Sequence, residues 1–461
     1  MKMESATGCS KRRTAMARCL LAGLCALAAC TIVCPIAGLG RRTTLRLLYS
    51  IPVPGEFVAV LEDVNPGAIA ILNGTGGTYA GRTEPSPDYD RPKLLLWNIP
   101  ERKLLREVPL GECVKRRAEL PPHLRALRLG PFRFVDNGAK VVGIQLPWLF
   151  SIDAVTGAEN SPLLLSPGLL KAASPYLQSL GPPLEASPSG RLVATVADQG
   201  ATAAKPRLVV LHADPLTIVA DAPLRHCVEA LAWSPDNARI AVLYTLFFDE
   251  NGGPVPWGRM DSARRQPDVE IFDAQSGRSL LSFRTGADQS GICFSHDGKT
   301  LWCVATPAEA EGLVMTLAVR LLATLSRAPM PSRVRWSQDV MRVFSSADGS
   351  LVRTIQGGST GFRGNLVISP SGRFAVADAS EIVPYHVAEP PTDQKIGAFT
   401  FLDAATGRVL FKYHKRMTGD YGASYRFAFT KDERFLLVDS NNFHNGPGPR
   451  LEERVDVYAI D

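Results

Sequence analysis

The residues best suited to chemistry in this sequence are aromatic, basic and imidazole side chains in its connecting segments. Trp, Tyr and Arg are the residue types that most often anchor protein interfaces, because each buries a large surface and keeps a polar group for hydrogen bonding. Seven such candidates lie in long segments without strand periodicity: Tyr89, Arg91, Trp257, Arg259, Tyr385, His386 and His444. We therefore predict that these segments bind a partner.

Two of these histidines also permit a different chemistry. Together with Asp249 or Asp88, His386 and His444 would supply the imidazole and carboxylate ligands that hold a divalent metal for hydrolysis. No HExxH, P-loop, GxSxG or dinucleotide-binding pattern accompanies them. We predict no catalytic residue, no cofactor and no metal site, and we keep a metal-dependent hydrolase or lactonase as the alternative.

Three cysteines stand out by position. Cys30 ends a Leu-Ala-Ala-Cys sequence that resembles the bacterial lipobox, in which the cysteine is lipidated. Cys293 and Cys303 flank a predicted hairpin turn, so an oxidising compartment would permit a disulfide between them. Two buried free thiols on adjacent strands are the equal alternative. No CxxC or Cys/His spacing of a zinc site occurs.

The first 40 residues have the layout of an export signal. A basic region, residues 1–18, precedes residues 19–40, an uncharged run long enough to cross a bilayer. The excess of Lys and Arg before this run places the N-terminus in the cytoplasm. A retained signal anchor, a lipoprotein signal and a cleaved signal peptide remain open, and each puts the following chain on the periplasmic or cell-surface side.

The net charge of +6 argues against nucleic acid once its distribution is considered. Residues 1–46 hold eight basic groups and one acid, so the remaining chain has 43 basic groups and 44 acids. A nearly neutral body offers no electrostatic footprint for a phosphate backbone. We predict no nucleic-acid partner.

Two strand-turn-strand patterns alternate along the rest of the chain. The first has a polar turn rich in Ser, Pro, Asp and Gly between apolar stretches, and it occupies residues 60–72, 132–144, 184–196, 231–244, 292–304, 366–378 and 427–439. The second usually turns at Thr-Gly or Ser-Gly and occupies residues 94–108, 149–159, 209–219, 269–283, 342–355, 399–413 and 455–461. Two hairpins per unit predict seven units of four strands each, which we name a to d in chain order.

A four-stranded antiparallel sheet repeated around an axis is a β-propeller blade. We therefore predict an all-β, seven-bladed propeller over residues 45–461, preceded by the transmembrane or signal helix. The last unit lacks its strand d, and Leu45–Ile51 is an apolar strand without another partner. Pairing of that strand with residues 455–458 would close the ring.

With its SPSG, SPDN and SHDG turns the chain resembles the WD-repeat-like propellers, including the bacterial SPDG type. It lacks the Gly-His and Trp-Asp dipeptides of true WD repeats. We therefore do not expect the hydrogen-bond relay that those residues form in WD repeats. In this strand order the b-to-c and d-to-a connections share one face, and most long connections fall there. We predict a non-enzymatic, membrane-anchored scaffold that binds a protein or other envelope component through that face.

Overall fold

The computed structural model describes residues 43–52, 58–65, 68–73, 93–109, 131–160, 162–166, 183–198, 205–245, 266–285, 291–305, 340–355, 360–381, 395–417, 421–444 and 454–461. Thr44–Asp461 form one compact unit and Met1–Thr43 another. The predicted basic region and apolar segment, residues 1–18 and 19–40, lie outside the described residues. No helix within the described ranges is both long and apolar enough to cross a bilayer.

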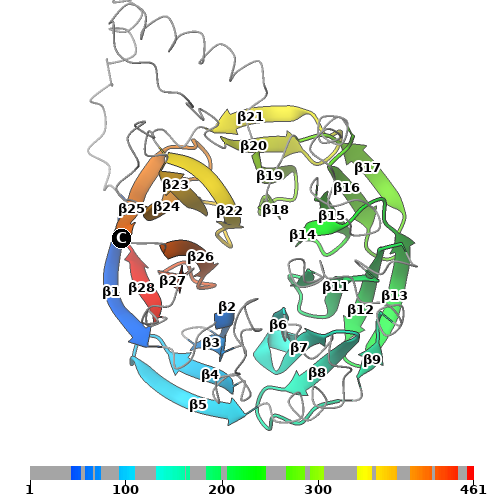
Figure 1. The fold of residues 1–461 in the computed structure, drawn as a ribbon, viewed down its shortest axis with the longest axis horizontal. Coiled ribbons are helices and arrows are strands. Elements are labelled where there is room, and N and C mark those ends of the chain that lie inside the picture. Colours follow the sequence, from blue (N-terminus) through cyan, green and yellow to red (C-terminus); the bar gives the residue numbers. More distant parts are fainter. Residues whose placement is uncertain are drawn as a thin grey trace, which may run out of the picture. The chain divides into compact units, whose positions relative to one another are not determined.

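The described residues of Thr44–Asp461 form seven four-stranded antiparallel sheets, which we call blades 1 to 7. Figure 1 shows them around a central axis, with strand a innermost and strand d at the outer wall. The all-β propeller expected from the sequence is confirmed. The alternating polar turns predicted this arrangement because each pair of apolar stretches folds back on itself.

Blades 1 to 4 follow chain order. Blades 1 and 2 contain β2 (Val58–Asn65), β3 (Ala68–Asn73), β4 (Lys93–Asn98), β5 (Lys103–Pro109), β6 (Phe132–Val135), β7 (Lys140–Gln145), β8 (Trp148–Asp153) and β9 (Leu163–Leu164). Blades 3 and 4 contain β10 (Leu184–Ala186), β11 (Leu192–Ala197), β12 (Arg207–Ala213), β13 (Leu216–Pro223), β14 (Val228–Trp233), β15 (Arg239–Tyr244), β16 (Val269–Asp273) and β17 (Ser279–Phe283).

Blades 5 and 6 continue the series, and blade 7 closes it. Blades 5 and 6 contain β18 (Ile292–Phe294), β19 (Thr300–Ala305), β20 (Val340–Ser345), β21 (Leu351–Ile355), β22 (Thr360–Ile368), β23 (Phe374–Glu381), β24 (Lys395–Asp403) and β25 (Val409–Met417). Blade 7 contains β26 (Tyr421–Phe429), β27 (Phe435–His444), β28 (Arg454–Ile460) and, as its strand d, β1 (Leu45–Pro52).

The predicted pairing of the first and last strands is confirmed. β1 pairs antiparallel with β28, with Leu47 opposite Tyr458 and Ile51 opposite Val455. Ile51 is only 1% exposed and packs in a cluster shared by blades 7 and 1. The two ends of the propeller sequence are therefore held together by backbone hydrogen bonds and apolar packing, which gives blade 7 its fourth strand.

The hydrophobic core consists of layers between neighbouring blades. Each cluster of buried side chains draws on two adjacent sheets, for example blades 3 and 4 or blades 6 and 7. Phe399 illustrates the packing, since its ring centroid lies 5.1 to 5.9 Å from those of Tyr413, Tyr425, Phe427 and Tyr458. A single blade would leave both faces in water, so closing the ring is what buries these side chains.

The Ser-rich turns between strands a and b act as turns in five blades. In each, the hydroxyl that opens the turn accepts a hydrogen bond from the backbone N–H five residues later, at 2.8 to 3.1 Å. The five hydroxyls belong to Ser187, Ser234, Ser295, Ser369 and Thr430. The side chain replaces a missing ladder bond, which explains why this residue type recurs there.

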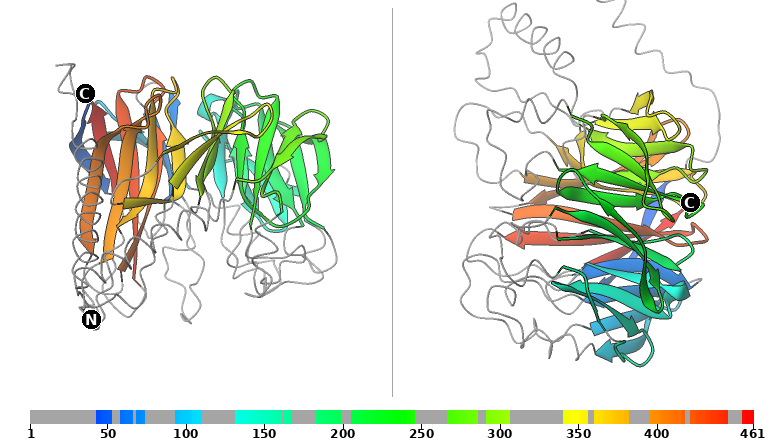
Figure 2. Two further views of the ribbon diagram at one scale, coloured as in Figure 1. Left: turned by 90° about the horizontal axis from the view of Figure 1, so that it is seen from above. Right: turned by 90° about the vertical axis from the view of Figure 1, so that its right-hand side faces the viewer.

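The connections divide the ring into two faces. Every a-to-b connection has at most five residues, whereas the four longest b-to-c connections span residues 74–92, 245–268, 306–339 and 382–394, and those at 198–206 and 445–453 have nine residues each. Two d-to-a connections, residues 110–131 and 165–183, are also long. We call the end of the strands that carries these connections the loop-rich face and the opposite end the short-turn face. The strands run between the two faces (Figure 2).

Candidate functional site

Most of the predicted binding residues lie outside the described residues. This holds for Tyr89, Arg91, Trp257, Arg259, Tyr385 and His386, and for Cys30. His444 is the last residue of β27, opposite Tyr421 at the loop-rich face. The described part of the chain therefore places one of the seven predicted residues, and it does so on the predicted face.

A polar cluster lies where the connection carrying Trp257 and Arg259 leaves blade 4. Its centre is Glu270, whose side chain is 5% exposed. One carboxylate oxygen accepts a hydrogen bond from the Tyr244 hydroxyl at 2.7 Å. The other accepts hydrogen bonds from Arg225, at 3.3 Å, and from the Ser279 hydroxyl. Charge-assisted hydrogen bonds of this kind fix a buried carboxylate in place.

The tyrosine of this cluster cannot act as an acid near neutral pH. Burial, followed by its hydrogen bond to the Glu270 carboxylate, raises the pKa of Tyr244 far above its usual range. The His226 ring packs edge-on against the Tyr244 ring, with 6.0 Å between centroids. His226 Nε2 also lies 3.0 Å from Gln266 Oε1. We call this cluster the polar base on blade 4; it joins the described strand ends that residues 246–265 connect.

A second polar group joins blade 4 to blade 5 at the same end. Asp268 is 1% exposed and accepts hydrogen bonds from the backbone N–H of Thr285, at 2.6 Å, and from its hydroxyl, at 3.1 Å. Arg342 of β20 donates to the Thr285 carbonyl at 2.9 Å. Sequence periodicity alone did not single out Asp268 or Glu270. The sequence feature that could have identified them is their position at the start of strand c, directly after a long connection.

The predicted disulfide is not present. Cys293 and Cys303 are both free thiols. Cys293 lies opposite Trp302, and Cys303 lies opposite Ile292. Side chains alternate between the faces of a strand, so the two thiols point to opposite sides of blade 5. Burial raises the pKa of Cys303 to about 12. Of the two interpretations of this pair, the free thiols on adjacent strands are confirmed.

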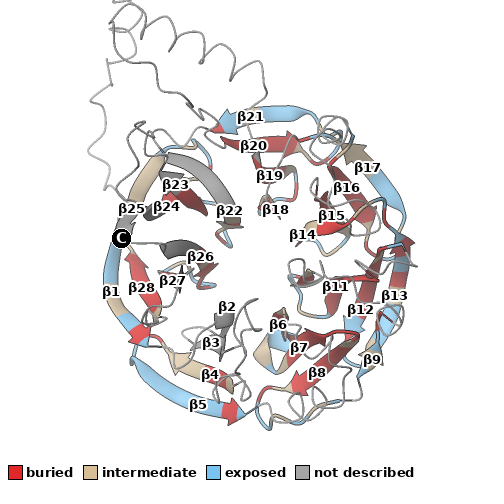
Figure 3. Ribbon diagram, viewed as in Figure 1, coloured by how far each residue is buried: buried red, intermediate tan, exposed pale blue. Residues whose placement is uncertain are grey.

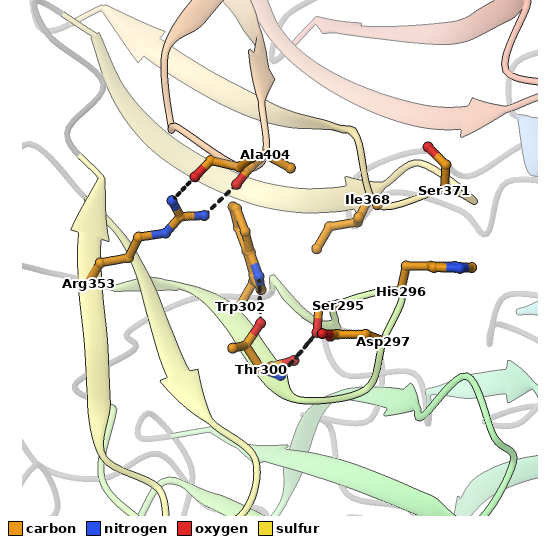
Figure 4. A pocket seen from close by; sticks show the side chains of 11 residues that line it. Ser295, His296, Asp297, Thr300, Trp302, Arg353, Ile368, Ser371 and Ala404 are labelled. Carbon is orange, nitrogen blue, oxygen red and sulfur yellow. Dashed lines mark hydrogen bonds between the residues drawn. The ribbon is translucent and has the colours of Figure 1, made fainter.

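A cavity of about 310 Å³ lies between blades 5 and 6 on the short-turn face. Figure 4 shows Arg353 donating hydrogen bonds to the carbonyls of Ala404 and Ala405, and its guanidinium lies 5.1 Å from the Trp302 ring centroid. Trp302 Nε1 donates to the Thr300 hydroxyl at 3.2 Å. Arg353 of β21 thus joins blade 5 to the c-to-d turn of blade 6, and we assign the cavity a structural role.

Blade 7 contains a buried carboxyl group at its boundary with blade 1. Asp439 is 1% exposed and lies opposite Val455, which belongs to the cluster shared by those blades. Burial raises the pKa of Asp439 to about 7, an effect that nearby Arg426 opposes and Asp456 strengthens. This raised pKa places the charge change of the Asp439 carboxyl near neutral pH.

The metal alternative rests on residues that the structure does not describe. Among the described residues, no group of three or more His, Cys, Asp or Glu side chains could hold a metal ion. His386, Asp249 and Asp88 lie outside those residues, and the side chain of His444 is not described.

No family model matches the sequence, and no curated protein matches it. Among solved structures, Kuenenia stuttgartiensis hydrazine synthase is similar, with 18% identity and a TM-score of 0.38. The match covers 61% of this chain and 63% of that chain, so less than two thirds of the similar structure is spanned.

Proposed function

We propose that this chain is a non-enzymatic, WD-repeat-like propeller of the SPDG type, tethered to a membrane on its extracytoplasmic side. Its loop-rich face binds a protein or another envelope component. The observation that carries this proposal is the strand topology, which gathers the longest connections at one end of the ring. Binding residues concentrate on long connections held by a rigid scaffold.

The polar base on blade 4 adds support. Glu270, Tyr244 and Arg225 fix the point where residues 246–265 leave the sheet. A connection held at such a base presents its side chains with less loss of conformational freedom on binding, which improves affinity. Trp257 and Arg259 belong to this connection and are the side chains we expect to contact the partner.

A comparative capture experiment tests the proposal. The full chain and the variant Trp257→Ala/Tyr385→Ala are used as baits against detergent-solubilised envelope, with captured proteins quantified by mass spectrometry. We expect a partner that the wild-type bait enriches and the double variant loses. The control is His296→Ala in a turn of the short-turn face, which should retain that partner. Equal capture by all three baits, or loss only with the control, would contradict the proposal.

The hydrolase alternative has its own measurement. A propeller hydrolase of the kind considered above would bind a stoichiometric divalent metal. Elemental analysis of the purified full chain after dialysis therefore separates the two functions. We expect less than one equivalent of any divalent metal; a full equivalent, lost in the His444→Ala variant, would favour the hydrolase.

A further inference from the structure

The exposed apolar side chains of the ring are not evenly distributed. Nine large hydrophobic residues are exposed among the described residues, and eight of them lie within the first three positions of a strand d. Leu164 of β9 lies opposite Trp148 at the loop-rich end of its blade, whereas the other seven lie at the short-turn end. We call these seven the aliphatic collar: Leu47, Leu104, Leu105, Ile218, Leu280, Leu351 and Val352. Figure 3 shows their strands, β1, β5, β13, β17 and β21, as the exposed outer wall of the ring.

The start of each of these strands lies at the short-turn face, because strand d follows the c-to-d turn. Val155, in the c-to-d turn of blade 2, is exposed on the same face, and Leu164 is the exception. At the opposite end of the same strands the exposed residues are polar or proline: Ser50, Pro52, Glu107, Pro109, Asp221, Pro223, Arg284 and Thr354. The exposed aliphatic side chains of these five strands thus lie near the short-turn face, interspersed with the exposed polar residues Arg46, Lys103, Thr217 and Ser279, and the loop-rich ends of the same strands expose none.

A repeated irregularity of the backbone lies in the same part of strand d as the collar. In six blades one extra residue bulges from strand d, and all six are leucine or valine: Leu48, Leu105, Val219, Leu280, Val352 and Leu410. A bulge protects an outer strand from pairing with another sheet. Val219 and Leu410 pack against the inter-blade clusters, whereas Leu105, Leu280 and Val352 are exposed members of the collar. Protection of the edge does not require an aliphatic side chain, so the type of these three exposed side chains needs a separate reason.

The chain connects to the ring at this same end. The backbone groups of Thr44 and Asp461 exchange hydrogen bonds of 3.3 and 3.0 Å beyond the β1–β28 pair, at the short-turn face. Only residues 41–43 separate Thr44 from the uncharged run of residues 19–40. Three fully extended residues reach roughly 10 Å. A bilayer that holds residues 19–40 is therefore within reach of the collar.

From these observations we propose that the short-turn end of the outer wall rests on a lipid bilayer, with the aliphatic collar at the headgroup boundary. The proposal rests on the membrane tether proposed above. It orients the loop-rich face away from the membrane, where an envelope partner can reach it. Aliphatic side chains lower their free energy at such a boundary, whereas the charged residues at the other end of the wall remain in water.

Two positions on one strand give a matched test. Leu280 and Arg284 are both exposed and lie four residues apart, about 13 Å along β17 and its end. The full chain carrying Leu280→Trp or Arg284→Trp is reconstituted into phosphatidylcholine vesicles with brominated acyl chains. Fluorescence quenching is measured after subtraction of the parent protein's signal. We expect several-fold stronger quenching for Leu280→Trp than for Arg284→Trp, with both variants as stable as the parent.

The other possible results of this experiment distinguish failure of the collar proposal from failure of the membrane tether. Flotation with the vesicles but equal quenching at the two positions, or stronger quenching at Arg284→Trp, would overturn the collar proposal and leave the tether intact. Failure to float with the vesicles would overturn both. If Leu105→Glu and Leu280→Glu convert a detergent-solubilised dimer into a monomer in light scattering, the collar joins two copies of this chain and the lipid proposal is wrong.

Discussion

Arg46 and Asp461 form an ion pair across 415 positions of sequence, with 3.1 Å between Nε and Oδ2. The pair joins the first and last strands of the ring, β1 and β28. Both side chains are well exposed, 63% and 46%, so water screens their attraction. Ring closure must therefore come from the backbone ladder between the strands and from the side chains buried beneath it.

The contrast between a surface pair and a buried side chain gives the first prediction. Ile51 lies on the same strand and is 1% exposed. Ile51→Ala should lower the free energy of unfolding by about 2 to 5 kcal/mol, because it leaves a cavity between blades 7 and 1. Arg46→Ala should leave the urea midpoint unchanged within error. Equal losses in the two variants would show that the ion pair, and not the packing, holds the ends together.

The polar base on blade 4 gives the second prediction. Tyr244→Phe removes the hydroxyl that donates to the buried Glu270 carboxylate. The loss of this bond should cost about 1 to 3 kcal/mol, since the carboxylate oxygen is left without that donor. Thr217→Ala, on the exposed part of β13, is the control and should change stability by less than about 0.5 kcal/mol. Urea denaturation of both variants checks the difference, and a neutral Tyr244→Phe would show that water replaces the hydroxyl.

The fold was predictable because its signals are local and repeated. Each polar turn is marked by its own residues, such as Ser234 with Asp236, whose side chains bond to each other and to the turn. The pairing of β1 with β28 followed from counting strands. By contrast, the direction of the Cys293 and Cys303 side chains depends on a one-residue register within the hairpin. The turn sequence does not set that register on its own.

The polar base was not predictable for a related reason. Glu270 meets Tyr244 across two paired strands and meets Arg225 from the preceding connection, so the three come from separate stretches of sequence. No short motif joins them. Only the register of β15 against β16, together with the packing of residues 224–227, brings their side chains into one place.

The thiols of blade 5 give the third prediction. Because burial raises the pKa of Cys303 to about 12, and raises that of Cys293 as well, neither thiol ionises in the native protein at pH 8. Iodoacetamide should leave Cys293 and Cys303 unmodified in the folded protein and label both after urea unfolding without reductant. Peptide mass spectrometry measures the labelling. A disulfide-linked pair of peptides would contradict the free thiols.

The buried carboxyl of Asp439 gives the fourth prediction, a dependence of stability on pH. Its pKa is about 7 in the folded protein, against 3.8 as its ordinary value, because burial disfavours the charged form. The folded state therefore binds more protons than the unfolded state between these values, and the contribution of Asp439 to stability falls as pH rises from about 4 to 7. Above pH 7 the carboxylate is charged in both states, and the full cost of burying that charge remains.

Asp439→Asn removes this charge and should raise the free energy of unfolding at pH 8 by up to a few kcal/mol, on the order of 1.4 kcal/mol for each pKa unit removed. At pH 4 the variant should match the parent, because the parent carboxyl is then protonated when folded.

Asp273→Ala is the contrasting control. Hydrogen bonds from Ser276 lower the pKa of Asp273, so its stabilising contribution is present at neutral pH and is lost as pH falls. Urea titrations at pH 4, 6 and 8 measure how the free energy of unfolding of each variant changes with pH. An Asp439→Asn variant that is less stable than the parent at pH 8 would contradict this prediction. It would show that a partner stabilises the charged carboxylate, with Arg426 as the candidate.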